Sequence, residues 1–228
     1  MVLNRPLGGK KLNDWEAIMI AEIKVGPASL SGLGDGVPVT ARGDKTGAIV
    51  NAQVHGAYTE SASRSVLHVA SNAVAGVAPG TALGTTPPFA LWNPPGSGRK
   101  ISVLKCTMGY VSGTLGAGSI VLAAVLSQVT VPTTGTELVP VCTDLGMPRG
   151  VGRIFTGSTW VSTPQILYPI ISMGAFLATT AVPLWDTIDV VDGSIIVEPG
   201  TGVMMQGVAA AGTSPLVIFG MKYEEIPL

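Results

Sequence analysis

The sequence predicts an all-β protein whose body is a jelly roll or another β-sandwich, with an extended N-terminal arm in front of it. Among the 228 residues are 30 glycines and 17 prolines, which favour frequent turns over long helices. In the second half of the chain, short apolar runs alternate with turn residues at regular intervals, as in sandwiches and barrels. Short glycine-rich strands also suit an irregular β-helix intertwined in a trimer, which is the alternative.

The N-terminal arm is expected to be amphipathic. Trp15, Ile18 and Glu22 follow one another at three- or four-residue steps, the spacing of one face of a helix. Residues 17–25 also alternate like a strand, so a short helix and a strand are both open for this stretch. In either conformation the arm would pack its apolar side on another surface.

A linker rich in glycine, proline and serine follows at residues 26–47. It contains few large apolar side chains, so it cannot supply a core. We therefore expect two parts in the chain. Residues 1–47 form the arm and linker, and residues 48–228 form the β-rich body.

Alternation with a period of two begins after the linker and predicts the strands of the body. The expected strands cover residues 49–54, 65–69, 101–111, 119–131, 138–142, 165–171, 188–190, 195–197, 203–208 and 216–223. The serine-rich stretch after Gly56 is expected to be a turn, and residues 73–100 are expected to be loop-like because prolines interrupt their short apolar pieces. Turn residues at 113–116, 192–193 and 199–200 predict hairpins between consecutive strands.

Charge and hydropathy argue against two classes of partner. The 13 basic and 14 acidic residues leave a net charge of −1, and no stretch gathers lysine or arginine for nucleic acid. The apolar runs are far shorter than the roughly 20 residues needed to span a bilayer, and no signal-peptide core follows the N terminus. Because only 12% of the residues are charged, we expect a soluble chain that associates with other subunits.

The two cysteines, Cys106 and Cys142, lie among apolar neighbours. Neither belongs to a Cys-x-x-Cys pair or lies near a histidine at metal-ligand spacing. We expect two buried thiols, with a single disulfide as the alternative. This pattern suits assembly in a reducing cytoplasm.

Side chains suited to catalysis or metal binding are few and scattered. The candidates are His55, His68, Asp144, Asp186, Asp189 and Asp192. The last three could bind a hard cation, and two of them could be the paired acids of a glycan hydrolase, but turn capping explains such aspartates more simply. The two histidines could meet across a hairpin and hold a metal with a third ligand, but ordinary polar-face positions explain them better. We expect no catalytic, cofactor or metal site, and hence no enzyme.

Three stretches of the body carry a resemblance to a known class of protein. They are LWNPPGSGRKI at residues 91–101, GYVSGTLGAG at residues 109–118, and the C-terminal stretch at residues 207–227. They resemble virion structural proteins of tailed bacteriophages, in particular capsid decoration or cement proteins. The resemblance implies a β-rich homotrimer, made in the host bacterial cytoplasm and located in the virion, that clamps neighbouring subunits of the major capsid protein. It carries over no catalytic residue.

The same resemblance suggests where subunits would meet. The interface candidates are Trp15, Ile18, Ile20, Trp92, Trp160 and Trp185. The first three would anchor the arm on the capsid shell or on a sister subunit. The three tryptophans of the body could instead fill its core, because large rings serve both purposes. The alternative function is a tail appendage or receptor-binding module that recognises a host glycan in a groove between subunits.

Overall fold

The computed structural model describes residues 22–24, 38–40, 56–173, 187–208 and 212–228. The chain divides into two compact units, Met1–Ala57 and Tyr58–Leu228, whereas the sequence analysis places the boundary after residue 47. In the first unit, strand β1 (Glu22–Lys24) pairs antiparallel with strand β2 (Pro38–Thr40). The strand interpretation therefore holds for residues 22–24, and the predicted linker contains a strand.

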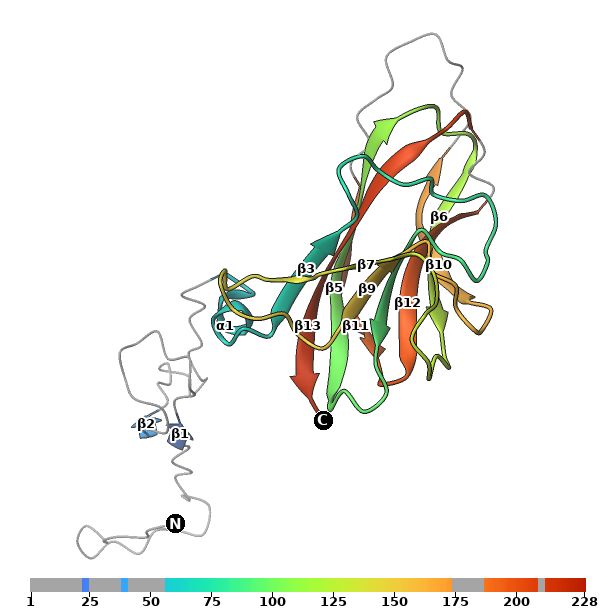
Figure 1. Cartoon of the computed structure of the whole chain (residues 1–228). Helices are drawn as coiled ribbons and strands as arrows, with labels where there is room; N and C mark the ends of the chain where they lie inside the picture. The colour runs from blue at the N-terminus through green and yellow to red at the C-terminus, as the bar shows by residue number, and fades with distance from the viewer. Residues whose placement is uncertain (1–21, 25–37, 41–55, 174–186, 209–211) are drawn as a thin grey trace, which may run out of the picture. The chain divides into compact units, whose positions relative to one another are not determined.

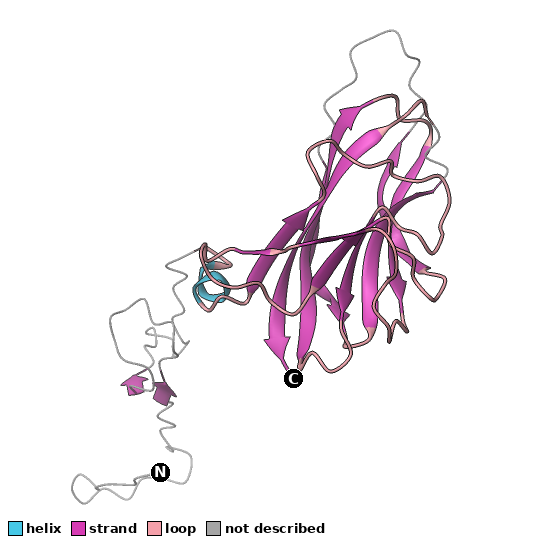
Figure 2. Cartoon of the chain, in the orientation of Figure 1, coloured by secondary structure: helices cyan, strands magenta, loops and turns pink. Residues whose placement is uncertain are grey.

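In the second unit, which we call the body, nearly all regular secondary structure is strand, so the predicted all-β class is confirmed (Figure 2). Its elements are α1 (Thr59–Ser63), β3 (Leu67–Ser71), β4 (Phe89–Asn93), β5 (Arg99–Ser112), β6 (Gly118–Val125), β7 (Thr136–Leu138), β8 (Val141–Cys142), β9 (Arg153–Thr156), β10 (Gln165–Met173), β11 (Thr187–Val197), β12 (Thr201–Val208) and β13 (Leu216–Pro227). Within the described part of the chain, no helix combines the length and the apolar character needed to cross a membrane.

The strands of the body form two antiparallel sheets (Figure 1). One sheet has the order β11-β5-β13-β3-β8 and the other has the order β10-β6-β12-β4-β9-β7. Eight strands, four from each sheet, give the interleaved order β11-β5-β13-β3 against β10-β6-β12-β4, which is the double Greek key of a jelly roll. Strand β8 extends one sheet, and β9 and β7 extend the other. The body is therefore a jelly roll, one of the two architectures that the sequence predicts.

The predicted hairpins are wrong. The turn at residues 113–116 joins β5 to β6, and the turn at residues 199–200 joins β11 to β12, so each leads from one sheet to the other. Asp192 and Gly193, both at positive φ, lie inside the single strand β11, where the register shifts between Val190 and Ile195. Turn residues indicate where the chain changes direction, but sheet packing decides which strand becomes the partner.

Other strand predictions need correction as well. The predicted strand 138–142 is two strands in different sheets, because Pro140 has no N–H to continue a ladder. The predicted strand 119–131 ends at Val125, where β6 ends. Strands β4 and β9 were not predicted, and the serine-rich turn is the short helix α1.

The body has two apolar cores. The first lies between the sheets and contains Phe89 and Leu91 of β4. The second lies on the outer face of the six-stranded sheet and contains Ala90 and Trp92 of the same strand. Because alternate side chains of β4 enter different cores, all five of its residues are buried and its sequence shows no polar alternation.

Both cysteines are buried free thiols, so the thiol prediction is confirmed. Cys106 lies in the first core, where burial raises the pKa of its thiol to about 12. A thiol with this pKa stays protonated and unreactive at neutral pH.

Candidate functional site: the open face of the five-stranded sheet

The outer face of the six-stranded sheet is closed by the chain itself. The indole of Trp160 covers Gly202 of β12 so closely that a methyl group on that glycine would come within 2.3 Å of the ring. Its N–H donates a hydrogen bond to the Ser158 hydroxyl (3.1 Å), and the Trp92 N–H donates to the Gln128 carbonyl (2.8 Å). Both tryptophans are only 2% exposed, so this face offers no large aromatic surface to another molecule.

The outer face of the five-stranded sheet, which we call the open face, is different. The strand register places one residue from each of its five strands in a line across the sheet. These residues are Val190, Lys105, Lys222, Val69 and Val141. Val190 and Val141, at the two ends of this lysine–valine row, are 58% and 51% exposed. Both edges of this face therefore expose an apolar side chain to solvent.

A second line of residues runs beside the first and is made of smaller side chains in its centre. Thr107, Gly220 and Ser71 lie in register, with Ile188 at the β11 end and 63% exposed. Gly220 has no side chain, and a methyl group there would come within 2.5 Å of the Thr107 hydroxyl oxygen. This small-residue row therefore lies low between its neighbours.

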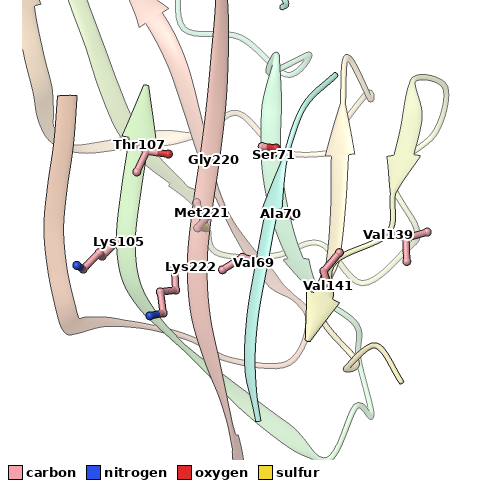
Figure 3. A pocket seen from close by; sticks show the side chains of 10 residues that line it. All are labelled: Val69, Ala70, Ser71, Lys105, Thr107, Val139, Val141, Gly220, Met221 and Lys222. Atoms are coloured by element: carbon pink, nitrogen blue, oxygen red, sulfur yellow. The ribbon is translucent and has the colours of Figure 1, made fainter. Parts of the chain in front are cut away.

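The members of the two rows on β5, β13, β3 and β8, but not those on β11, line a shallow groove of about 450 Å³ across the centre of the open face (Figure 3). The lysines lie at one end of this groove (Figure 3). Val139 and Val141, from the segment that follows β7, lie at the other end and are 65% and 51% exposed. One end of the groove is therefore basic and the other is apolar.

The two lysines are an unfavourable pair within the chain. Lys105 and Lys222 are direct cross-strand partners, and like charges in that position repel. Among the described residues, no carboxylate forms an ion pair with either of them. The ring of Tyr58 lies 4.0 Å from the Lys222 ammonium and 5.8 Å from that of Lys105, a cation–π contact. Burial, followed by the charge of Lys105, lowers the pKa of Lys222.

Two of the predicted interface residues, Trp92 and Trp160, do not lie on this face. Trp92 and Trp160 are packed in the second core, so the core alternative applies to both of them. The remaining candidates, Trp15, Ile18, Ile20 and Trp185, lie outside the described residues. The lysine–valine row leaves no local signal in the sequence, because its members come from five strands and meet only through the pairing register.

The scattered aspartates do not gather into a site. Asp189 accepts a hydrogen bond from the Tyr168 hydroxyl (2.8 Å), and Asp192 accepts one from the Tyr58 hydroxyl (3.0 Å). Asp144 accepts one from the Ser65 hydroxyl (3.2 Å). The described ranges contain no group of three histidine, cysteine or acidic side chains that could hold a metal ion. Asp186 and His55 lie outside those ranges.

One buried ionisable pair lies at the end of the five-stranded sheet. His68 and Glu225 are 1% and 3% exposed, with 4.0 Å between the His68 Nε2 and a Glu225 carboxylate oxygen. The backbone N–H of Gly152 donates to the other oxygen (2.8 Å), and the His68 ring lies 5.5 Å from that of Tyr223. Burial lowers the pKa of His68, while Glu225 opposes this effect, so the imidazole is neutral at pH 7. Because the pKa is lowered on folding, the free energy of unfolding decreases as the pH falls.

Comparison of the chain with protein-family models, curated proteins and solved structures finds no match in any of the three.

Proposed function

We propose that this chain is a structural protein of a tailed-bacteriophage particle that bridges major capsid subunits as a decoration or cement protein. The observation that carries the proposal is the difference between the two outer faces of the body. One face is closed by Trp160 and Trp92, and the other presents exposed apolar side chains and two lysines that form no ion pair with the described residues. A subunit that must bind neighbours needs such an unfilled face.

The architecture supports the same proposal. Jelly rolls are common in viral capsid proteins, where the rigid sandwich presents flat sheet faces and loops to neighbouring subunits. The N-terminal unit would supply a second attachment, and three copies would form the assembled unit, as the resemblance to decoration proteins implies. In this proposal the chain works by binding alone and catalyses no reaction.

The alternative proposal places the same body in a tail appendage that binds a host glycan. It is favoured by the fold, because lectins also use jelly rolls. Trp160 cannot stack on a sugar in this arrangement, since its ring is 2% exposed. The number of copies in a particle distinguishes the two proposals, because a decoration protein is present in numbers comparable to those of the capsid protein.

The test combines light scattering on the purified chain with quantification of its copies in particles that carry it. The double variant Ile188→Asp/Val190→Asp should bind particles much more weakly than the wild type, because it places charge on the open face. The control Val74→Asp/Val161→Asp changes two valines that are 85% and 68% exposed elsewhere, and it should bind normally. Wild-type particle binding by the first variant would contradict the proposal.

A further inference from the structure

The lysine end of the groove is complementary in charge to a negatively charged partner. Lys105 and Lys222 face each other across adjacent strands, and neither forms an ion pair with a carboxylate of the described residues. Both contact the ring of Tyr58, whose hydroxyl donates a hydrogen bond to Asp192. Burial, followed by the charge of Lys105, lowers the pKa of Lys222. A carboxylate between the two ammonium groups would remove the repulsion and form two charge-assisted hydrogen bonds at once.

The valine end of the groove is suited to apolar side chains of a partner. Val139 and Val141 are more than half exposed, and Val69 adjoins Val141 directly in the register. Between the two ends the floor is formed by Gly220 and the small side chains of Thr107 and Ser71, with the Thr107 hydroxyl lying close over the glycine. The groove is therefore graded from basic to apolar over a centre of small residues.

The strand spacing sets the length of the partner segment. The line from Lys105 to Val141 crosses β5, β13, β3 and β8, which is three inter-strand steps. At about 4.8 Å per step this is about 14 Å, which an extended chain spans with roughly four residues. Because the line runs across the strands, the partner is recognised through side chains rather than by adding a strand to the sheet edge.

We propose that the open face binds an extended segment of a partner protein that carries neighbouring carboxylates at one end and apolar side chains about four residues further along. This inference rests on the proposed role of the open face in assembly and adds the chemistry of its partner. A second copy of the same face does not fit, because a twofold pairing would bring two basic groove ends into one interface.

The test uses the purified full chain and a random peptide library as the probe. Library members that bind the immobilised chain are selected, sequenced and labelled for fluorescence anisotropy. The variant Lys105→Gln/Lys222→Gln removes the basic end, and Val141→Ser weakens the apolar end. The matched controls are Lys100→Gln/Arg149→Gln, whose side chains form exposed ion pairs outside the groove, and Val74→Ser.

Selected peptides should be rich in aspartate and glutamate next to apolar residues. Their affinity should fall at least about tenfold in the lysine variant and about threefold in Val141→Ser, with little change in the controls. Affinity should also fall as salt is added, because the contacts at the basic end are partly exposed.

Two outcomes would overturn the inference. One is a selection that yields no enriched peptides, or peptides that bind the lysine variant as tightly as the wild type. The other is a wild-type oligomer that the lysine variant converts to monomer, which would make the open face an interface between copies of this chain. In either case the protein could still be present in particles at high copy number, so the proposed function is judged separately.

Discussion

The packing of Trp160 on Gly202 allows a sharp test of how the outer face of the six-stranded sheet is closed. A methyl group on Gly202 would lie 2.3 and 2.4 Å from two carbon atoms of the Trp160 ring, far inside the contact distance. The ring is 2% exposed and its N–H is bound to Ser158, so it cannot swing aside easily. The two positions should therefore be strongly coupled in the free energy of unfolding.

The expected magnitudes follow from this geometry. Gly202→Ala should cost about 1–3 kcal/mol in the wild type through overpacking, and Trp160→Ala should cost about 3–5 kcal/mol through the loss of a buried ring. When the ring is absent, the strongest remaining contact of the new methyl group is with the Leu91 carbonyl oxygen at 2.9 Å. Gly202→Ala should then cost less by about 1–2 kcal/mol, well above the usual error of additivity.

Equilibrium unfolding in urea, followed by circular dichroism, measures all four corners of this double-mutant cycle. Gly84→Ala is the matched control, because a methyl group there meets nothing closer than 3.9 Å and should cost the same in both backgrounds. If Gly202→Ala has the same cost with and without the indole, the ring does not lie on Gly202. The closure of this face would then need another explanation.

Three further predictions concern ionisable groups. The pKa of His68 is lower in the folded than in the unfolded chain, so the free energy of unfolding should decrease as the pH falls below about 6.5. In urea unfolding, His68→Gln should make this decrease smaller between about pH 7 and 5. An unchanged pH dependence of the free energy of unfolding would contradict this. Arg153 donates a hydrogen bond to Glu137 (2.8 Å) and lowers the pKa of that carboxyl. Glu137→Gln should therefore lower the free energy of unfolding in urea by about 1 kcal/mol at neutral pH, and by less below pH 4.5. An equal loss at both pH values would refute the pairing. The Cys106 thiol, with a pKa of about 12, should react with a disulfide reagent only after the chain unfolds. Rapid reaction of Cys106 in the native chain would show that its side chain is not buried.

Much of the fold could be predicted because strand formation leaves a local pattern. The alternation in β5 and β13 reflects one face in the first core and another face that is more open. Strand β4 could not be predicted, because its two faces are buried in two different cores and its sequence therefore does not alternate. The prolines that flank the strand on both sides also favour a loop.

The site could not be predicted because it depends on pairing between distant strands. Lys105 and Lys222 are 117 positions apart in the sequence, and only the antiparallel register of β5 and β13 makes them neighbours. Val69 and Val141 join the same row through β3 and β8. The sequence favours tryptophans as interface candidates because their large rings bury much apolar area. Such a ring is equally suited to a core, which is where Trp92 and Trp160 lie.

The insertion at residues 126–164, between β6 and β10, links the two faces of the body physically. It carries Trp160, which closes the outer face of the six-stranded sheet, and it also carries Val139 and Val141, which form the apolar end of the groove on the opposite side. Pro140 ends the ladder of β7 and lets the chain pass from one sheet to the other at this point. Other apolar side chains of this segment are also exposed, among them Leu126, Val129, Leu145 and Val161. Val139 and Val141 differ from these because they form one end of a groove that residues of β3, β5 and β13 continue. The groove, and not exposure alone, is therefore the reason to expect a partner at these two valines.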